Sequence, residues 1–239
     1  IGTLTNCTVN NLSIKQSQYG DGRGFFVHGV VNGLTMDNVV IDMDSEVSPT
    51  PLGDDGNYGF YLASNVSNLD INNMTIHDAD IYPFYIGGTL TTASITNCTL
   101  DNFYGHTTHE MIRFNSTVTG LTMTNVMVNC DVAGTTDDKD SGVGFAGAVS
   151  NTTLTNVSVN ESDGDGIYTW INATNLTITG GKLTNCYDGI EFYNCNYART
   201  NVDLVNIKID NSTRYGILYP SCFGGTNDDV DMTRDTITN

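Results

Sequence analysis

The residues of this chain that could do chemistry are mostly aspartates. They gather in three polar stretches: "GDD" with Asp54 and Asp55, "DDKD" with Asp137, Asp138 and Asp140, and "SDGDG" with Asp163 and Asp165. Paired carboxylates can hydrolyse a glycosidic bond when they lie about 5–9.5 Å apart, and clustered carboxylates can hold calcium. Asp54 and Asp55 are therefore alternative catalytic residues, and calcium is the one cofactor that these clusters could hold.

The histidines and cysteines do not form a recognisable metal site. The four histidines, His28, His77, His106 and His109, lack zinc-ligand spacing, and the six cysteines contain no C-x-x-C pair. His106 and His109 share one loop, but no Cys or third His stands near them. We expect no metal site of this kind.

A phrase that recurs along the chain indicates which elements must position these residues. Its consensus is apolar, Thr or polar, apolar, any residue, Asn, apolar, any residue, apolar. It begins near Gly2, Leu34, Leu69, Ala93, Leu121, Thr152, Leu176, Val202 and Val230, at spacings of 24 to 35 residues. A period in this range is typical of a solenoid. No linker divides the chain, so we predict one domain over 1–239, either a segment of a longer protein or a self-assembling subunit.

Each phrase predicts two short strands joined by a bend, because its apolar residues alternate. The recurrent Asn marks the bend, since Asn tolerates left-handed backbone conformations. These bend residues are Asn38, Asn73, Asn97, Asn125, Asn156 and Asn206, with Gly180 in one coil. A third strand follows, as in "GFYL" (59–62) and "GIEF" (189–192). The prediction is an all-β, single-stranded parallel β-helix of about eight coils of three short strands, right-handed by the crossover rule.

In this repeat the chain resembles the right-handed parallel β-helix proteins, the pectate-lyase-like superfamily, over nearly its whole length. The resemblance lies in the repeat and not in a catalytic motif. It implies hydrolases that use aspartates on neighbouring rungs, and lyases that use calcium with an Arg or Lys base. "GDD" resembles the paired Asp of the polygalacturonase-like hydrolases, but the rest of their pattern is absent. Arg113, the one basic residue that should point out of a central third strand, is the alternative lyase base.

The outward residues of the third strand should form a column on the sheet surface: Phe26, Tyr61, Tyr85, Arg113, Gly144, Tyr168, Glu191 and Leu218. Tyr61, Tyr85 and Tyr168 would form a carbohydrate-binding platform, with Arg113 and Glu191 as polar contacts or alternative catalytic residues. Long insertions precede this strand and could form the walls of a groove. Alternatively, those loops or another copy of the protein cover the aromatic rings. We lean towards a protein that is not an enzyme.

The cysteines have different expected roles. Cys7 and Cys98 fall at the inward position directly after the bend, where a thiol packs as a small apolar group. Cys195 and Cys222 end the third strands of adjacent coils at the same register, which predicts a disulfide and an oxidising compartment. The state of Cys130 and Cys186, about two coils apart, stays open.

The composition favours an extracellular protein without nucleic-acid partners. Twenty-seven acidic and nine basic residues give a formal charge of −18, which repels phosphate backbones. No apolar run is long enough to span a membrane. Twelve Asn-x-Ser/Thr sequons occur, many of them expected by chance in so Asn- and Thr-rich a chain. The preferred glycosylation candidates are Asn11, Asn65, Asn115, Asn151, Asn160, Asn172, Asn175 and Asn211.

The visible chain begins inside one rung and stops inside another, without a capping element, so we expect copies to stack head-to-tail. The predicted function is a secreted, N-glycosylated structural protein that assembles into a filament, sheath or surface layer. In this the chain resembles archaeal and bacterial cell-surface β-helix proteins. The alternatives are a polysaccharide lyase or hydrolase and a carbohydrate-binding adhesin, both using the outward face of the third strand, with polysaccharide as the partner.

Overall fold

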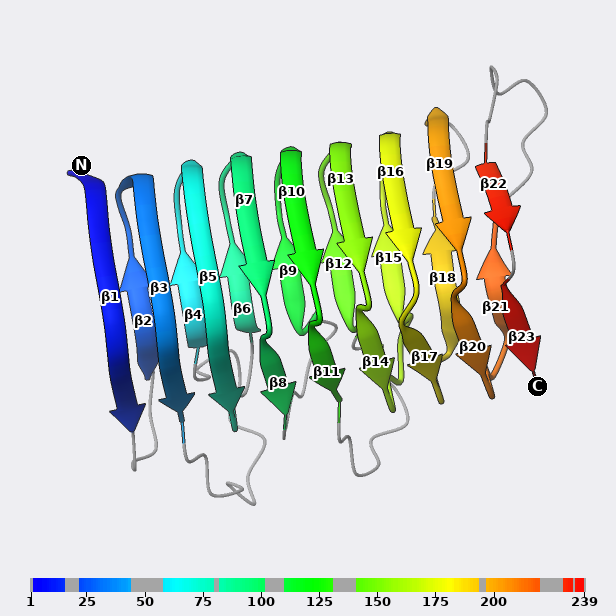
Figure 1. Ribbon diagram of the computed structural model, residues 1–239, viewed down its shortest axis with the longest axis horizontal. Helices are drawn as coiled ribbons and strands as arrows, with labels where there is room; N and C mark the ends of the chain where they lie inside the picture. The colour runs from blue at the N-terminus through cyan, green and yellow to red at the C-terminus, as the bar shows by residue number, and fades with distance from the viewer. Residues whose placement is uncertain are drawn as a thin grey trace.

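The chain folds as an all-β parallel solenoid (Figure 1). The computed structural model describes residues 2–15, 22–43, 58–79, 82–101, 110–130, 141–193, 197–219, 230–233 and 235–238. Within these ranges every strand pair is parallel and joins neighbouring coils, as the sequence repeat predicts. No helix of the described residues is long and apolar enough to cross a membrane.

Sheet A contains 15 of the described strands. In the first three coils its strands are long and continuous: β1 (Thr3–Lys15), β3 (Val30–Asp42) and β5 (Val66–His77). From the fourth coil onward, a bend divides each into two: β7 (Leu90–Thr96) and β8 (Thr99–Asp101), β10 (Val118–Thr124) and β11 (Met127–Asn129), β13 (Val149–Thr155) and β14 (Ser158–Asn160), β16 (Ala173–Thr179) and β17 (Lys182–Thr184), β19 (Arg199–Val205) and β20 (Lys208–Asp210), β22 (Val230–Thr233) and β23 (Thr236–Thr238). The prediction of three separate strands per coil therefore holds from β7 onward.

Sheet B forms a second face with one strand from each coil. Its eight described strands are β2 (Arg23–Val27), β4 (Tyr58–Leu62), β6 (Tyr82–Ile86), β9 (Ile112–Phe114), β12 (Val143–Phe145), β15 (Ile167–Thr169), β18 (Asp188–Phe192) and β21 (Tyr215–Leu218). In Figure 1 the strands of sheet A run down the front and those of sheet B run up behind, as the chain advances from its N-terminus. The winding is right-handed, as expected for parallel crossovers.

The core is a set of inward columns that run along the solenoid axis. In sheet A, Ile41, Ile76 and Leu100 stack in register and are almost fully buried. In sheet B, Phe60 stacks on Phe84 with ring centroids 4.7 Å apart. Each such side chain contributes about 1.5–3 kcal/mol by leaving water, but only when the next coil covers it. This is why the repeat fixes the inward positions and leaves the outward ones free to vary.

The predicted bend residues have the predicted conformation. Asn38, Asn73, Asn97, Asn125, Asn156 and Asn206 have φ between 52° and 54°, and Gly180 has φ 65°. Their side chains form a ladder, in which the Nδ2 of Asn125 donates to the Oδ1 of Asn97 and the Nδ2 of Asn156 donates to that of Asn125, both at 3.2 Å. Asn therefore meets two demands at once: it tolerates the left-handed backbone, and it bonds the equivalent residue of the neighbouring coil.

A second column of left-handed residues lies earlier in the sheet A strands, and the sequence analysis missed it. Its members are Asn6, Gly33, Asn68, Thr92, Gly120, Asn151, Asn175 and Asn201. Here too the amides form a ladder: Asn175 donates to Asn151 and Asn201 donates to Asn175, each at 2.8 Å. The first coil thus carries left-handed Asn6 and Asn11. Cys7 packs against the core as expected, but it pairs with Leu34, ahead of the bend at Asn11, and not directly after the bend. Cys98 is buried directly after bend residue Asn97, as predicted.

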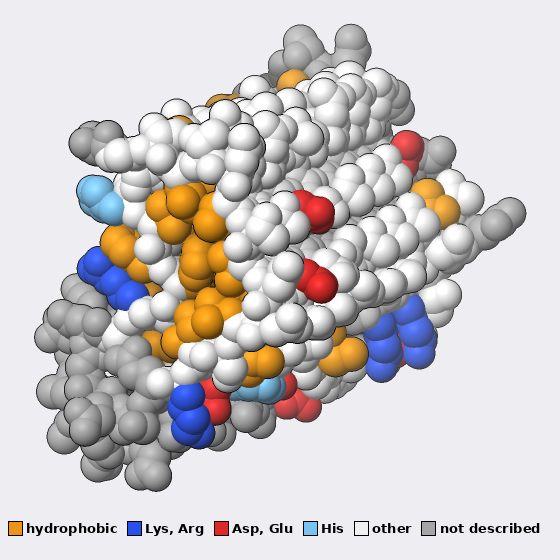
Figure 2. All heavy atoms as spheres, turned by 60° about the vertical axis from the view of Figure 1, so that its left-hand side comes forward, with side chains coloured by type: hydrophobic (Ala, Val, Ile, Leu, Met, Phe, Trp, Pro, Cys, Tyr) orange, Lys and Arg blue, Asp and Glu red, His pale blue; other side chains and the backbone are white. Residues whose placement is uncertain are grey.

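One end of the solenoid exposes part of its core. The inward side chains of the first coil, Leu4, Cys7, Val9, Leu12 and Ile14, are only partly buried, whereas their counterparts in β3 are almost fully buried. With Phe25 and Val27 of β2 they form an apolar end face, which Figure 2 shows as a band of hydrophobic side chains. Burial of this face requires another layer of polypeptide.

Candidate functional site

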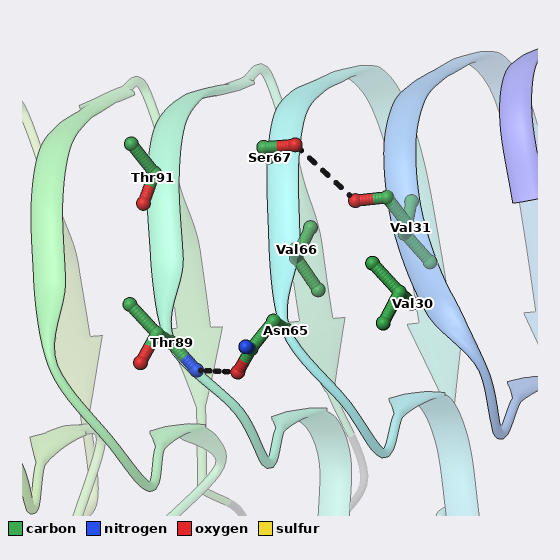
Figure 3. Close-up of a pocket in the computed structure, with 7 residues that line it drawn as sticks. All are labelled: Val30, Val31, Asn65, Val66, Ser67, Thr89 and Thr91. Carbon is green, nitrogen blue, oxygen red and sulfur yellow. Dashed lines mark hydrogen bonds between the residues drawn. The ribbon is translucent and has the colours of Figure 1, made fainter. Parts of the chain in front are cut away.

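A hollow lies on the sheet A side of the solenoid, where β3, β5 and β7 begin. It is lined by Val30, Val31, Asn65, Val66, Ser67, Thr89 and Thr91 (Figure 3). The Thr89 N–H donates to the Asn65 Oδ1 at 3.0 Å, and the Ser67 hydroxyl donates to the Val31 carbonyl at 3.4 Å. The lining has no charged group, and these polar groups are already paired within the protein. The hollow therefore offers a small polar ligand little to recognise.

The outer face of sheet B carries the residues that the sequence analysis selects for carbohydrate binding. The strand register places them in one line, which we call the outer column: Phe26, Tyr61, Tyr85, Arg113, Gly144, Tyr168, Glu191 and Leu218. The predicted stacking is confirmed. The same register puts Arg113 three coils away from Glu191, about 14 Å at the usual strand spacing. These two alternative catalytic residues do not meet in one site.

A second line of outward residues stands three positions before the outer column in each coil. We call it the flanking column: Arg23, Tyr58, Tyr82, Glu110, Ser141, Asp165, Asp188 and Tyr215. The sequence contains a signal for this column in the four-residue units "YGFY" (58–61), "DGIY" (165–168) and "DGIE" (188–191). In each unit the first residue belongs to the flanking column and the last to the outer column. The charged partner of Arg113 is Glu110 of this column. Glu191 contacts Asp165 of this column and Arg214, which directly precedes Tyr215.

The N-terminal half of this face is a cluster of stacked rings, which we call the tyrosine cluster: Phe26, Tyr58, Tyr61, Tyr82 and Tyr85. The rings of Tyr61 and Tyr85 are stacked and nearly parallel, with 13° between their planes and centroids 4.6 Å apart. Burial raises the pKa of Tyr82 to about 12. Because these rings turn their faces toward one another, mainly edges and hydroxyl groups are left for a ligand. Predicted binding residues Tyr61 and Tyr85 thus offer little stacking surface.

Arg113 is held in an ion pair on this face. Its Nη1 lies 2.5 Å from the Glu110 Oε2, and its Nε and Nη2 donate to the Asn115 Oδ1 at 3.1 and 3.0 Å. Burial, the largest single effect, would lower the pKa of Arg113, but the charge of Glu110, its hydrogen bond to Arg113 and the nearby Tyr82 and Tyr85 together raise the pKa above its ordinary value. A guanidinium held in its charged form is a poor base, which argues against the lyase alternative.

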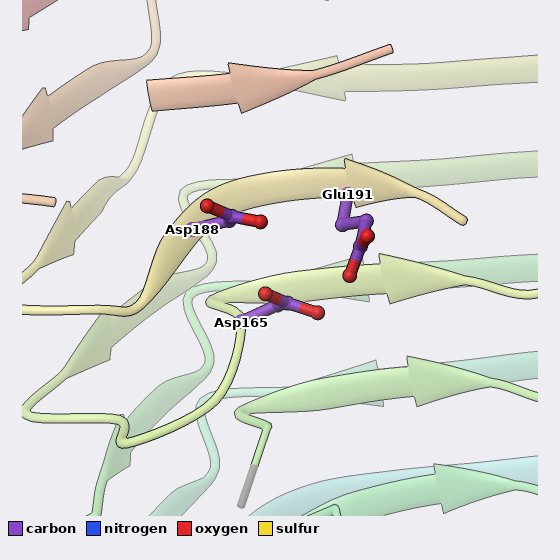
Figure 4. Close-up of side chains that lie close together, drawn as sticks. All are labelled: Asp165, Asp188 and Glu191. Atoms are coloured by element: carbon purple, nitrogen blue, oxygen red, sulfur yellow. The ribbon is translucent and has the colours of Figure 1, made fainter. Parts of the chain in front are cut away.

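Three buried carboxyl groups meet farther along the same face, and we call them the acidic trio. Asp165 belongs to the sixth coil, whereas Asp188 and Glu191 belong to β18 in the seventh (Figure 4). One oxygen from each lies within 4.8 Å of the others, and the residues are at most 7% exposed. They are the one group of described residues with the spacing of a three-ligand metal site. Of the three, Glu191 was selected from the sequence as a site residue and Asp165 as a member of a cluster that could hold calcium, whereas Asp188 was not selected.

Arg214 neutralises part of the charge of the acidic trio. Its Nε lies 3.1 Å from both carboxylate oxygens of Asp188, and its Nη2 lies 3.5 Å from the Glu191 Oε1. The Tyr215 N–H donates to the Asp188 Oδ1 at 2.9 Å. Hydrogen bonding to Asp188 raises the pKa of Arg214 further above its ordinary value. The guanidinium thus supplies a fixed positive charge to the trio.

The remaining excess of negative charge is reduced by a proton on Asp165. Burial, and then the hydrogen bond to Glu191, raises the pKa of Asp165 to about 9. Asp165 is therefore protonated at neutral pH and shares its proton with Glu191. The trio with Arg214 is a charge-compensated cluster that joins three coils.

Exposed aromatic rings lie beside the acidic trio, and we call them the tryptophan cluster: Tyr168, Trp170 and Tyr193. Trp170 is 44% exposed and Tyr193 is 50% exposed, with ring centroids 4.9 Å apart and 40° between the rings. Tyr168, in register with Glu191, packs edge-on against Trp170. The sequence analysis missed Trp170 and Tyr193, which follow Tyr168 and Glu191 by two positions. They could have been predicted by extending the alternation of inward and outward side chains two residues past the end of each strand.

The geometry does not match a glycoside hydrolase. A two-carboxylate mechanism needs the carboxyl groups to flank a sugar, about 5 Å apart or more. In the acidic trio the oxygens are closer together, the side chains are buried, and Asp165 and Glu191 bond each other. The acidic trio is therefore better explained as a fixed polar surface beside the tryptophan cluster than as a general acid and base that act on a substrate.

The structure relates most of the sequons to the fold. In eight of the twelve, the Asn has a positive φ: Asn6, Asn11, Asn73, Asn97, Asn151, Asn156, Asn175 and Asn211. The fold needs Asn at such positions, and in six of the eight an apolar residue and then Thr or Ser follow, whereas Asn151 is followed by Thr152 and Asn211 by Ser212. Among the glycosylation candidates, Asn175 and Asn211 use Nδ2 in the ladders, whereas Asn65, Asn115 and Asn172 use Oδ1 as an acceptor. Asn160 ends β14.

Several predicted features lie outside the described residues. These are the alternative catalytic pair Asp54 and Asp55, and the predicted disulfide between Cys195 and Cys222. The four described cysteines are thiols: Cys7, Cys98, Cys130 and Cys186. Burial raises the pKa of Cys98 to about 11 and that of Cys186 to about 12, so both are unreactive at neutral pH.

Comparison with known proteins identifies no relative: no protein-family model matches the chain, and no curated protein matches its sequence.

Proposed function

We propose that this protein is a non-catalytic carbohydrate-binding solenoid whose binding surface is the tryptophan cluster beside the acidic trio. The observation that carries the proposal is the exposure of the Trp170 and Tyr193 rings on a rigid strand face. The C–H face of a sugar ring packs on such rings, and neighbouring polar groups orient its hydroxyls. This is the adhesin alternative of the sequence analysis, moved from the tyrosine cluster to the later coils.

Three features support binding without turnover. The Arg113 guanidinium is held charged by Glu110, so it is unsuited to abstract a proton. The acidic trio shares a proton internally and lies mostly out of reach of solvent. In the tryptophan cluster, burial raises the pKa of Tyr168, so its hydroxyl stays protonated and is not a base at neutral pH.

Affinity electrophoresis and calorimetry against a panel of neutral and acidic polysaccharides test this proposal. We expect Trp170→Ala to weaken binding by about fivefold, since one stacked ring contributes about 1 kcal/mol. Tyr85→Ala, in the tyrosine cluster, is the matched control and should bind like the wild type. Unchanged binding by Trp170→Ala, or no binding by the wild type to any member of the panel, would refute the proposal. Release of reducing ends or unsaturated products would replace it with the enzymatic alternative.

We also propose, as a second candidate function, assembly into a filament, sheath or surface layer outside the cell. The apolar end face of the first coil supports it, because a second copy stacked head-to-tail would bury Leu4, Val9 and Leu12. The acidic composition and the sequons fit a secreted, N-glycosylated protein of the kind found in prokaryotic and archaeal cell surfaces. A further coil of the same polypeptide would cover the face equally well.

Electron microscopy of the protein from its native source distinguishes coverage of the apolar end face by a second copy from coverage by a further coil of the same polypeptide. Head-to-tail assembly predicts filaments or sheets whose rungs continue across subunit junctions. In solution, Leu12→Asp should abolish the association, whereas Thr153→Asp on the side of the solenoid should not. Uniform single rods at high concentration would reject assembly and leave carbohydrate binding as the proposed function.

A further inference from the structure

The outer face of sheet A carries a regular grid of hydroxyl groups that neither proposed function uses. In four successive coils, formed by β7, β10, β13 and β16, the outward residues are threonine or serine at three positions per strand. We call these twelve residues the hydroxyl grid: Thr91, Ser94 and Thr96; Thr119, Thr122 and Thr124; Ser150, Thr153 and Thr155; Thr174, Thr177 and Thr179. The strand register aligns equivalent positions from one coil to the next.

The backbone fixes the spacing of this grid in two directions. Neighbouring strands lie about 4.8 Å apart. The first grid residue of each strand stands three positions before the second, with a left-handed residue between them, whereas the second and third, such as Thr122 and Thr124, stand two positions and about 6.6 Å apart. The residues between them, such as Met123, Leu154 and Ile178, are at most 1% exposed and anchor each strand in the core. Threonine is stiff at χ1, so its hydroxyl and methyl groups hold their places. Figure 1 shows the four strands side by side and nearly parallel.

The grid hydroxyls are available to an external partner. The side chains of Thr122, Thr124, Thr153, Thr155, Thr177 and Thr179 make no hydrogen bond to any other residue that the structure describes. Thr122 and Thr153 are exposed, and the other four are half-buried. By contrast, Thr96 donates to Asn72 at 3.0 Å, and Thr119 bonds Ser150. The face thus combines methyl groups with unpaired hydroxyls.

The grid is also free of charge, in a chain whose formal charge is −18. The nearest charged positions in its central column lie outside it, at Asp70 in β5 and Asp203 in β19. A charged side chain binds its hydration water strongly and imposes its own geometry on it. A face without charges leaves water free to follow the spacing of the hydroxyl groups.

We propose that the hydroxyl grid binds ice. A single dissolved molecule gains little from a flat face, since small-ligand sites are concave. A solid whose oxygens repeat in two dimensions can engage many positions at once, and the weak contacts then act together. The two spacings of the grid are close to oxygen repeat distances in hexagonal ice. Methyl groups between the hydroxyls favour removal of the disordered water layer.

Thermal hysteresis and ice-affinity partitioning of the complete chain test the proposal. The wild type should depress the freezing point below the melting point, facet growing ice crystals and partition into the ice. Thr153→Lys puts a bulky charge at the centre of the grid and should reduce both activities to the level of buffer. Thr35→Lys, in the same column but outside the grid, is the matched control and should retain them. Circular dichroism confirms that both variants are folded.

Three results would overturn the assignment. The wild type could show neither hysteresis nor partitioning, or Thr153→Lys could remain fully active. Binding to crystalline cellulose or chitin, lost in Thr153→Lys, with no effect on ice, would show that the grid recognises a different solid. Trp170→Ala should keep full ice activity, so failure of this proposal is distinguishable from failure of carbohydrate binding on sheet B.

Discussion

On sheet A the strands β7, β10, β13 and β16 each carry outward threonine or serine at three positions, whereas sheet B displays carboxylates, arginines and aromatic rings on its outer face. On sheet B these groups bond one another across coils, as Arg214 does with Asp188 and Glu191. On sheet A the central hydroxyls make no such bonds, and the coils are joined by two asparagine ladders, one at the bend beyond the grid and one between its first and second columns. The same winding thus supports one face that contributes to stability and one whose side chains are left for a partner.

The largest expected effect is the removal of Asp188. This carboxylate is fully buried and faces Arg214, so Asp188→Ala leaves a guanidinium without its main partner. We expect the free energy of unfolding to fall by about 3–5 kcal/mol. Asp203→Ala, an exposed aspartate on sheet A, is the control and should change it by less than about 0.5 kcal/mol. Urea denaturation measures both, and equal losses would mean that the two faces do not differ as described.

An intermediate effect is expected at the asparagine ladder. Asn125 has φ 54° and bonds both Asn97 and Asn156, so Asn125→Ala adds backbone strain to the loss of two hydrogen bonds. We expect a loss of about 2–3 kcal/mol in the free energy of unfolding. Asn125→Gly relieves the strain and should lose about 1 kcal/mol less. If the two variants are equally stable, the ladder and not the backbone conformation explains why Asn recurs at the bend.

These ladders also explain how much the sequence could predict. The bend residues were predictable because the left-handed backbone and the side-chain ladder both select Asn. Cys7 was misplaced because the first coil contains two left-handed residues, Asn6 and Asn11, and the pattern does not tell which one is the bend. The outer column followed from alternation alone. Its partners did not, because the pairing of Glu191 with Arg214 depends on how the chain turns before β21, where no periodicity applies.

A third difference between the faces should appear in the dependence of stability on pH. Asp165 has a pKa near 9 in the folded state, well above the ordinary value of 3.8. The contribution of protonated Asp165 to the free energy of unfolding is complete below about pH 4. It is lost as the pH rises toward 9, because the unfolded chain releases this proton at lower pH than the folded protein does. Stability should therefore fall over this range, with a smaller slope in Asp165→Asn. Thr153→Asn on sheet A, which changes no titratable group, should keep the wild-type slope.

Melting temperatures between pH 4 and pH 9 give this comparison directly. Identical slopes in the wild type and Asp165→Asn would mean that Asp165 ionises in the folded protein as it does in the unfolded chain. The acidic trio would then carry its full negative charge, and Arg214 would be its sole compensation.

The smallest expected effect tests whether the hydroxyl grid has any structural role. Thr122→Val, Thr153→Val and Thr177→Val each replace a hydroxyl by a methyl group of similar shape, and β-branched residues suit strands equally well. Since these hydroxyls bond no other described residue, each variant should change the free energy of unfolding by less than about 0.5 kcal/mol. Thr152→Val, whose hydroxyl is buried and donates to the Ser150 carbonyl, serves as the contrasting inward position. A loss of 1 kcal/mol or more at the outward positions would show that the grid hydroxyls stabilise the solenoid through bound water. Threonine would then recur at these positions because it stabilises the fold, and the two faces would differ only in how much their outward side chains contribute to the free energy of unfolding.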